Sequence, residues 1–245
     1  MTDRGSTAIV TGGGKRVGEA IVRALLEDGW TVVAHVHRSE DRVAEGAVRA
    51  VADLADDDCA QKIFDAARGL PPVRLLVNNA ARFSFDGFGA TNAAEFDQHM
   101  RINARAPMLL IDQLAKHHSG HDDALVVNLL DAKLASPNPD FLSYTLSKFA
   151  LAGLGEIAAR ALAGKGIRVN AIAPALMLPS GEQGVENFAA VHELNPLKRG
   201  TQIADVIAAL RFLVDSTGVT GQTLVLDGGQ RFMNLDRDVQ FLETK

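Results

Sequence analysis

The fold of this chain is constrained most by a series of short runs rich in Val, Ile and Leu, separated by longer stretches whose apolar residues recur at helical spacing. Continuous apolar runs of this length are typical of strands buried on both faces of a parallel sheet. Their alternation with helical stretches predicts a doubly wound α/β fold, with a parallel sheet of about seven strands and helices on both faces. The predicted strands are Thr7–Val10, Thr31–Val36, Val48–Val51, Leu75–Val77, Leu125–Leu129, Arg168–Ile172 and Leu224–Leu226.

The composition changes nowhere in a way that would mark a linker, so the 245 residues are predicted to form one domain spanning residues 1–245. Ligands of such sheets bind at the carboxyl ends of the strands. The segment Pro174–Pro196 contains three prolines and two glycines, Gly181 and Gly184, and is predicted to be a long mobile loop. A loop of this length beside the sheet edge is a candidate lid over a substrate site.

Composition excludes several classes of function. The formal net charge is -5 and no run of Lys or Arg is present, so nucleic acid is not an expected partner. The polar start of the chain and the lack of a long apolar stretch predict a cytoplasmic protein without a membrane segment. A single cysteine, Cys59, excludes an internal disulfide and a multi-cysteine metal site, and it fits a reducing compartment.

A glycine-rich turn directly follows the first predicted strand. It reads Thr11-Gly12-Gly13-Gly14-Lys15-Arg16-Val17-Gly18 and leads into a stretch of helical periodicity. Glycines let the backbone approach a pyrophosphate, and the start of a helix offers it unpaired N–H groups and partial positive charge. The turn therefore predicts a dinucleotide phosphate site, with a plain tight turn as the alternative. Its predicted contact residues are Gly12, Lys15, Arg16, Val17 and Gly18.

The end of the second strand indicates which dinucleotide is preferred. A site for NAD usually places an acidic residue here, which binds the ribose hydroxyls, but this chain has His35-Val36-His37-Arg38-Ser39. Arg38 and Ser39, aided by Arg16, suit a 2′-phosphate instead, so NADPH is the predicted cofactor, with His37 as a further predicted contact. Solvated residues at a strand end are the alternative. His35 and His37 alternate along the strand, but no third ligand is near, so a hydrogen-bonded strand histidine is predicted rather than a metal site.

Small and polar residues follow the third and fourth strands at the same edge of the sheet. Asp53 and Leu54 are placed to contact an adenine ring, and Asn79 and Ala80 to line the floor of the cofactor cleft. The pair Asn78-Asn79 at the end of a strand is also an ordinary turn signal.

Tyr144 and Lys148 stand four residues apart within a predicted helix from Phe141 to Leu162. Residues at this spacing share one helix face. A positive neighbour stabilises phenolate, so Lys148 is expected to lower the pKa of Tyr144 from its ordinary value of about 10. The pair is therefore a candidate proton donor, although a surface tyrosine beside a solvated lysine has the same spacing.

Together these motifs resemble the short-chain dehydrogenase/reductase family over essentially the whole chain. Two positions depart from the usual family pattern: Arg16 replaces the middle glycine of the phosphate turn, and Asp131 replaces the catalytic serine. Both departures are similar to those of the pteridine reductases and the dihydromonapterin or dihydrofolate reductases of this family, as is the strand end His35 to Ser39. The residues in the family's order and spacing are Thr11 to Gly18, Asn78 to Ala80, Asn103, Tyr144 to Lys148 and Asp227-Gly228-Gly229.

The resemblance implies a Rossmann-fold reductase that uses NADPH to reduce a C=N or C=O bond. Tyr144 would donate the proton, and Lys148 would bind the nicotinamide ribose and keep Tyr144 acidic. Asn103 would hold a water molecule that resupplies the proton through Lys148. Pro174 would contact the nicotinamide.

The substrate that the resemblance implies is a flat pteridine such as a dihydropterin or a dihydrofolate. Phe83 would stack on its ring and Leu176 would form an apolar wall, although Phe83 could instead cap the core. Asp131 would pass on a proton and bind a ring nitrogen, although it could merely cap a turn. Lys133 could reach an acidic substrate tail, but a solvated loop lysine is the plainer interpretation.

Two other functions fit the same residues. A general carbonyl or 3-oxoacyl reductase would share the fold but would ordinarily have serine at position 131. A non-catalytic NADP-binding regulatory protein would have lost the chemistry, which the retention of Asn103, Tyr144 and Lys148 argues against. The resemblance also implies a homotetramer packed through long helices and C-terminal segments, and the tail Arg231–Lys245 could order that interface or close over a neighbouring site.

Overall fold

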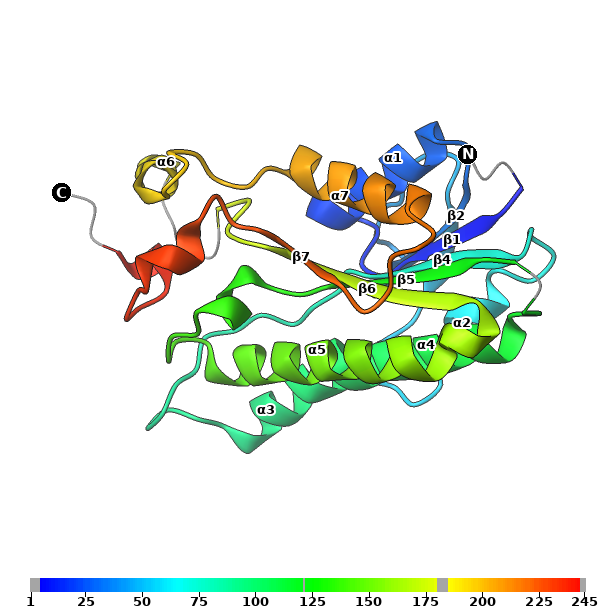
Figure 1. Ribbon diagram of the computed structural model, residues 1–245. Helices are drawn as coiled ribbons and strands as arrows, with labels where there is room; N and C mark the ends of the chain where they lie inside the picture. The colour runs from blue at the N-terminus through cyan, green and yellow to red at the C-terminus, as the bar shows by residue number, and fades with distance from the viewer. Residues whose placement is uncertain (1–4, 121, 180–184, 243–245) are drawn as a thin grey trace.

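The computed structural model describes residues 5–120, 122–179 and 185–242. It contains one sheet of seven parallel strands in the order β3-β2-β1-β4-β5-β6-β7 (Figure 1). This confirms the doubly wound α/β fold, and every predicted strand overlaps an observed one. The strand order reverses between β1 and β4, so their carboxyl ends frame the crevice in which such sheets bind ligands. The strands are β1 (Thr7–Val10), β2 (Thr31–Val36), β3 (Val48–Val51), β4 (Val73–Asn78), β5 (Ala124–Leu129), β6 (Ile167–Pro174) and β7 (Thr223–Leu226).

Helices cover both faces of the sheet (Figure 1). Successive residues of a strand face opposite sides, so Ile9 packs into the core beneath one helical layer while Ala8 and Val10 pack into the other. On one face lie α1 (Arg16–Glu27) and α7 (Ile203–Asp215); on the other lie α2 (Cys59–Asp65), α4 (Ala106–His117) and α5 (Leu142–Leu162), with α3 (Ala93–Met100) packed on α5. In the described part of the chain, no helix is both long and apolar enough to cross a membrane.

The segment Pro174–Pro196 is not the continuous loop that its prolines predicted. Pro174 is the last residue of β6, and a helix, α6 (Val185–Leu194), occupies much of the remainder. Long-range contacts hold this helix: His192 Nε2 lies 2.9 Å from the Leu176 carbonyl oxygen, and Asn187 donates to the Leu242 carbonyl at 3.1 Å. Gly181 and Gly184 lie outside the described residues.

The C-terminal segment, residues 230–242, folds back over the carboxyl edge of the sheet. It carries two short 3₁₀ turns, η4 (Gln230–Met233) and η5 (Val239–Phe241). η5 contacts α6, and η4 contacts η2 (Ala132–Ala135), the turn that follows β5 (Figure 1). The segment therefore packs against its own chain at the edge where the predicted site residues gather.

Candidate active site

A cavity of about 1010 Å³ opens at the carboxyl edge of the sheet. It extends from the turn between β1 and α1, past the ends of β2, β4, β5 and β6, to the C-terminal segment. The sequence-predicted residues that line it are Gly12, Lys15, Arg16, Val17, Gly18, His37, Asp53, Leu54, Asn79, Ala80, Phe83, Asp131, Tyr144, Lys148, Pro174 and Leu176. Arg38, Ser39 and Asn103 are not among the lining residues.

The glycine-rich turn has the close backbone packing that only glycine permits. Gly12 has φ +65°, and a Cβ on Gly18 would lie 2.0 Å from the Gly12 carbonyl oxygen. His35 connects the turn to the chain after β3. Its Nδ1 accepts a hydrogen bond from Gly12 N at 3.1 Å, and its Nε2 lies 3.0 Å from the Ala52 carbonyl oxygen. The prediction of a hydrogen-bonded strand histidine is therefore confirmed. Among the described residues no group of acidic, histidine or cysteine side chains could hold a metal.

Thr11 and Asn79 join the ends of β1 and β4. The Thr11 hydroxyl accepts from the backbone N–H groups of Asn79 and Ala80, each at 3.0 Å, and the Asn79 amide donates to the Thr11 carbonyl at 2.8 Å. The same amide donates to the Gly12 carbonyl at 3.3 Å. Asn79 thus lines the cavity, and its hydrogen bonds with Thr11 hold it in place. The sequence singled out Thr11 only as part of the glycine motif.

Arg42, rather than Arg38, lines the cavity near the end of β2. A Cβ on Gly14 would lie 2.6 Å from the Arg42 carbonyl oxygen, so the glycine turn and the chain around Arg42 are in close contact. The Arg38 backbone N–H is bound to the Asp41 carboxylate at 3.0 Å, and the Ser39 carbonyl accepts from Arg49 at 2.9 Å. Arg42 was missed because the sequence motif places the cation directly at the strand end.

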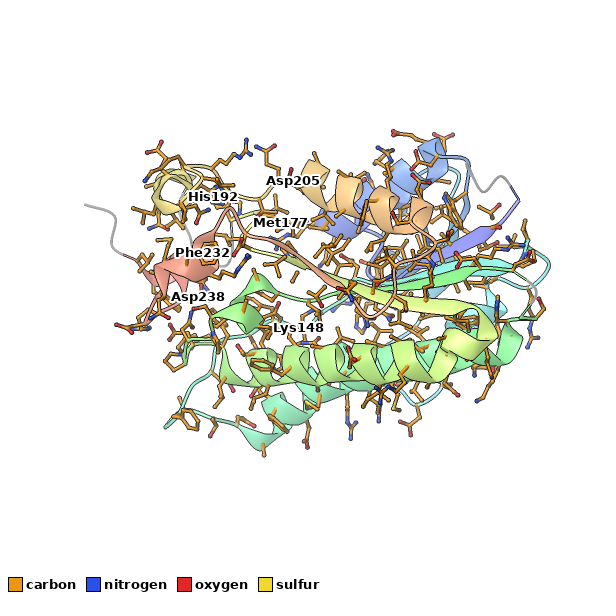
Figure 2. The ribbon with its side chains drawn as sticks, in the orientation of Figure 1. Lys148, Met177, His192, Asp205, Phe232 and Asp238 are labelled. Atoms are coloured by element: carbon orange, nitrogen blue, oxygen red, sulfur yellow. The ribbon has the colours of Figure 1, made fainter. Side chains whose placement is uncertain are left out.

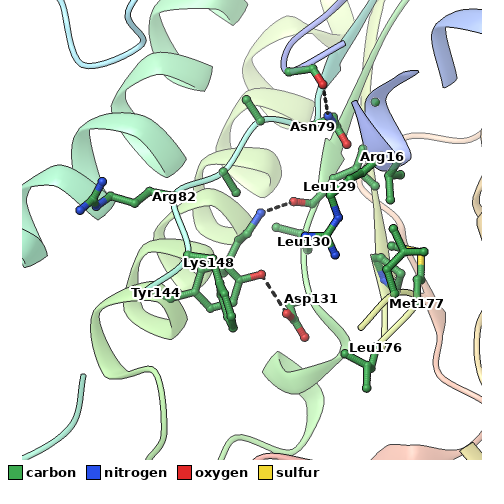
Figure 3. A pocket seen from close by; sticks show the side chains of 18 of the residues that line it. Arg16, Asn79, Arg82, Leu129, Leu130, Asp131, Tyr144, Lys148, Leu176 and Met177 are labelled. Carbon is green, nitrogen blue, oxygen red and sulfur yellow. Dashed lines mark hydrogen bonds between the residues drawn. The ribbon is translucent and has the colours of Figure 1, made fainter. Parts of the chain in front are cut away.

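Tyr144, Lys148 and Asp131 meet in the middle of the cavity (Figure 3). The Tyr144 hydroxyl donates to Asp131 Oδ2 at 2.8 Å, and Lys148 Nζ donates to the Leu129 carbonyl at 2.6 Å. Lys148 Nζ also lies 5.6 Å from the centre of the Tyr144 ring. Tyr144 and Lys148 come from the first turns of α5 and Asp131 from the chain just after β5, so the predicted shared helix face is confirmed.

The pKa of Tyr144 is shifted in the direction opposite to the one that its spacing from Lys148 predicted. Burial, and then the Asp131 charge, raise the pKa of Tyr144 well above its ordinary value, so the expectation that Lys148 lowers it is wrong. The reason is that the phenol donates to a carboxylate, whereas the ammonium group is bound to a backbone carbonyl. Burial also raises the pKa of Asp131 and lowers the pKa of Lys148 to about 8. Both members of the Tyr144–Asp131 pair therefore hold their protons more strongly than in water.

Asp86, which the sequence did not identify as a site residue, caps the start of α5. Its carboxylate accepts from Ser143 N at 2.9 Å and from the Ser143 hydroxyl. Phe141, at the N-cap position, has φ +55° and offers no side-chain cap of its own. The loop after β4 thus supplies the cap for the helix that carries Tyr144.

Asn103 lies outside the cavity lining, in a π-helical turn, η1 (Arg101–Arg105). Its amide donates to the Arg82 carbonyl and the Ser147 hydroxyl, each at 2.9 Å, and its oxygen accepts from Arg82 N at 2.7 Å. Both amide hydrogens are therefore engaged within the protein, and Asn103 joins the loop after β4 to α5.

Phe83 forms the aromatic wall beside the reacting groups. It stacks on Phe141 with ring centres 4.4 Å apart, meets Tyr144 edge-on at 4.8 Å, and remains 45% exposed. Phe85 packs instead on Phe141 and Phe241. Neither Phe85 nor Phe88 lines the cavity, so among the three phenylalanines of this loop Phe83 is the one available for stacking.

Lys133 is buried, not solvated as its sequence position suggested. Its Nζ donates to the Asp140 carbonyl at 2.6 Å and to Asp238 Oδ2 at 3.2 Å. Asp238 belongs to the C-terminal segment, 105 residues further along the chain (Figure 2). Such a distant pairing has no signal in the local sequence.

Comparison with known sequences gives relatives along almost the whole chain. Residues 14–231 match the sequence model of the family described as enoyl-(acyl carrier protein) reductase. The chain is 30% identical to L-xylulose reductase of Bos taurus over 237 residues, which are 92% of this chain and 96% of the relative. It is 27% identical to the 3-oxoacyl-(acyl-carrier-protein) reductase FabG of Staphylococcus epidermidis over 239 residues, which are 91% and 98% of the two chains.

Two solved structures share the fold closely. FolM Alternative dihydrofolate reductase 1 from Brucella canis, complexed with NADP, is 37% identical, with a TM-score of 0.88 over 94% of this chain and 95% of that one. The corresponding protein from Brucella suis, also in complex with NADP, is 36% identical, with a TM-score of 0.87 over 94% and 96%. The chain belongs to the short-chain dehydrogenase/reductase family of oxidoreductases.

Proposed function

We propose that this protein is an NADPH-dependent reductase and that residues 1–245 act as one NADP-binding domain. The glycine turn lines one end of the cavity, and its Gly14 and Gly18 pack so closely against the Arg42 and Gly12 carbonyls that a Cβ at either position would clash, which suits a turn whose backbone binds a dinucleotide phosphate. The start of α1 adds unpaired N–H groups and partial positive charge. The structures of both FolM relatives in complex with NADP support this assignment.

The 2′-phosphate would bind near the end of β2, with Arg42 as its main cation and Arg38 and Ser39 at the margin. Arg42 lines the cavity, and an arginine there suits a phosphate better than a ribose hydroxyl. His37, Asp53 and Leu54 would surround the adenosine, since all three line the same end. Lys148 and Pro174, at the other end, would contact the nicotinamide ribose and ring.

NADPH bound there would supply a hydride to the substrate. Tyr144 would donate the accompanying proton from its hydroxyl group, which burial and Asp131 keep protonated. Asp131 accepts a hydrogen bond from this hydroxyl at 2.8 Å as a carboxylate; because its pKa is raised, it would take up a proton and then pass it to the Tyr144 oxygen across the same contact. Lys148, with a pKa of about 8, would resupply that pair near neutral pH.

The substrate class that fits best is a dihydropteridine, in which hydride adds to the carbon and the proton to the nitrogen of a C=N bond. The observation that carries this choice is the Asp131 carboxyl hydrogen-bonded to Tyr144, because a carboxyl can both donate to and accept from a ring nitrogen. Phe83, half-exposed beside Tyr144, offers a stacking surface, and Leu176 an apolar wall. The similarity to the two FolM structures points the same way.

A general carbonyl or 3-oxoacyl reductase is the second candidate, favoured by the similarity to FabG of Staphylococcus epidermidis. The two are separated by steady-state turnover with NADPH of 7,8-dihydropteridines, simple ketones and β-ketoacyl thioesters. We expect the dihydropteridines to be reduced with the highest kcat/KM. Rapid reduction of the thioesters with untouched dihydropteridines would refute the substrate assignment, and tight NADPH binding without any turnover would revive a non-catalytic role.

We also propose a cytoplasmic homotetramer. Cys59 is buried and unpaired, which suits a reducing compartment. The adjacent helices α4 and α5 expose Met108, Leu146, Phe149 and Ile157, which would be covered by a second copy. Sedimentation velocity tests this directly: a monomer at micromolar concentration would contradict it.

A further inference from the structure

The wall of the cavity that faces the catalytic groups is built by the chain's own C-terminal segment. Gln230, Arg231, Leu235, Asp238, Val239 and Gln240 all line the cavity. The position of this wall is fixed at Asp140, whose carboxylate accepts from Arg237 Nε and from Asp238 N, each at 2.8 Å. Aromatic contacts fix it a second time, because Phe241 lies parallel to Phe141 with ring centres 5.9 Å apart. The cavity therefore needs no neighbouring subunit to complete this side.

Within that wall Asp238 and Lys133 form an ion pair at the cavity surface. Asp238 Oδ2 accepts from Lys133 Nζ at 3.2 Å, and Oδ1 accepts from Gln240 N at 3.2 Å. The Asp238 side chain keeps 17% of its exposure, whereas that of Lys133 keeps 7%. A carboxylate has about four acceptor sites, so Asp238 retains acceptors that can face a ligand. Both Asp238 and Lys133 line the cavity, and the Asp238 carboxylate is the more exposed member of the pair.

This ion pair lies beside the reacting groups. Lys133 N donates to Asp131 Oδ1 at 2.8 Å, and Lys133 Nζ lies 5.3 Å from the centre of the Phe141 ring, on which Phe83 is stacked. After burial and Asp131, the charge of Asp238 is a further cause that raises the pKa of Tyr144. A substituent on a ring stacked against Phe83 would thus come close to Asp238.

Two arginines that line the cavity, Arg231 and Arg82, are also paired with carboxylates, whereas Lys148 Nζ is bound to the Leu129 carbonyl. Arg231 is bound to Asp227 at 3.1 Å, and Arg82 is bound to Glu95 at 2.8 Å. A negatively charged substituent near Asp238 would therefore face its carboxylate, while both arginines are already neutralised by carboxylates of their own. Like charges placed together at a binding site discriminate strongly between ligands.

We propose that Asp238 is a specificity-determining residue of this active site, which disfavours substrates with an anionic substituent and favours those with an uncharged one. This inference rests on the proposed function, because it concerns the substituent of the ring that Phe83 would stack. Removing the Asp238 charge would leave Lys133 as an unneutralised cation in the same wall. Removing the Lys133 charge would leave Asp238 as an unneutralised anion. The two changes should therefore shift the preference in opposite directions.

The test compares the binding of biopterin, whose side chain is uncharged, with that of folate, whose side chain carries carboxylates. Titration calorimetry on the NADP⁺-saturated protein gives the ratio of the folate to the biopterin dissociation constant. Asp238→Asn keeps an acceptor oxygen for Gln240 and should lower this ratio by about tenfold, while Lys133→Met should raise it. The matched control is Asp236→Asn, an exposed residue two positions away that does not line the cavity and should leave the ratio unchanged.

An unchanged ratio in Asp238→Asn, or an equal weakening of both ligands, would overturn the inference and indicate a merely structural role. If Asp238→Asn fails to fold, Lys133→Met decides alone, and an unchanged ratio overturns the inference. Turnover of the 7,8-dihydro forms with NADPH is measured separately. Charge-dependent binding without turnover would refute the proposed function and leave the role of Asp238 standing. Absence of binding of either ring to the wild-type protein would overturn both.

Discussion

Lys148 is expected to destabilise the folded protein at neutral pH. Burial lowers its pKa from 10.5 to about 8, so the unfolded chain binds this proton more strongly than the folded one. At about 1.4 kcal/mol for each pH unit, the difference costs about 3 kcal/mol of unfolding free energy at pH 7. The cost is fully present below pH 8 and disappears as the pH rises from 8 to 10.5, where the unfolded lysine also loses its proton.

Replacement of Lys148 by methionine should therefore stabilise the fold. The change leaves the Leu129 carbonyl without its 2.6 Å hydrogen bond, a penalty of about 1 kcal/mol that does not depend on pH. We expect Lys148→Met to be more stable than the wild type by about 2 kcal/mol at pH 7 and less stable by up to about 1 kcal/mol at pH 10.5. Activity should fall at the same time, as is common where a functional group is held in a destabilising position.

Equilibrium urea unfolding at pH 7 and pH 10.5 measures both differences. Lys165→Met is the matched control, because Lys165 is exposed and should show less than about 0.5 kcal/mol of change at either pH. If the difference in unfolding free energy between Lys148→Met and the wild type is the same at both pH values, the claim that burial lowers the pKa of Lys148 is refuted. A loss of stability at pH 7 would refute it as well.

The phosphate end, the start of α5 and the catalytic carboxyl each allow a further test. Arg42→Ala should raise the dissociation constant for NADPH by about 10- to 100-fold, as expected for a lost charged hydrogen bond, and barely affect NADH. Arg38→Ala should have the smaller effect in the same fluorescence titration, and equal losses for both cofactors would contradict the assignment. Asp86→Ala, which uncaps α5 at Ser143, should lower the free energy of unfolding by about 1–2 kcal/mol in urea, and unchanged stability would count against the cap. Asp131→Ser should lower kcat/KM for dihydropteridines at least about tenfold more than for ketones, and parallel losses would show that Asp131 does not select the substrate.

The parts of the fold and site that could be predicted are those with local signals. The inner strands β1, β2, β4 and β5 are buried on both faces and read as apolar runs, and all seven predicted strands overlap observed ones. The glycine turn and the spacing of Tyr144 and Lys148 are set by backbone geometry within a few residues, and the structure brings both to one cavity. Asp131 follows a strand end, which is where this architecture gathers its site residues.

The parts that could not be predicted depend on contacts between distant segments. Helix α6 is held by bonds to Leu176 and Leu242, and the prolines around it gave the opposite signal. Lys133 is paired with a residue of the C-terminal segment, so its burial has no local trace. The direction of the Tyr144 pKa follows from which neighbour receives its hydrogen bond, and helical spacing alone does not determine that.

The most direct test of the central claim is single-turnover reduction of a 7,8-dihydropterin by the NADPH complex, in the wild type and in Tyr144→Phe. If the buried Tyr144 hydroxyl is the proton donor, the wild type should oxidise one NADPH for each dihydropterin reduced. Tyr144→Phe should react at least about 100-fold more slowly, as expected for loss of a general acid, with NADPH affinity within about threefold of the wild type. Reduction at the wild-type rate by Tyr144→Phe would contradict the account.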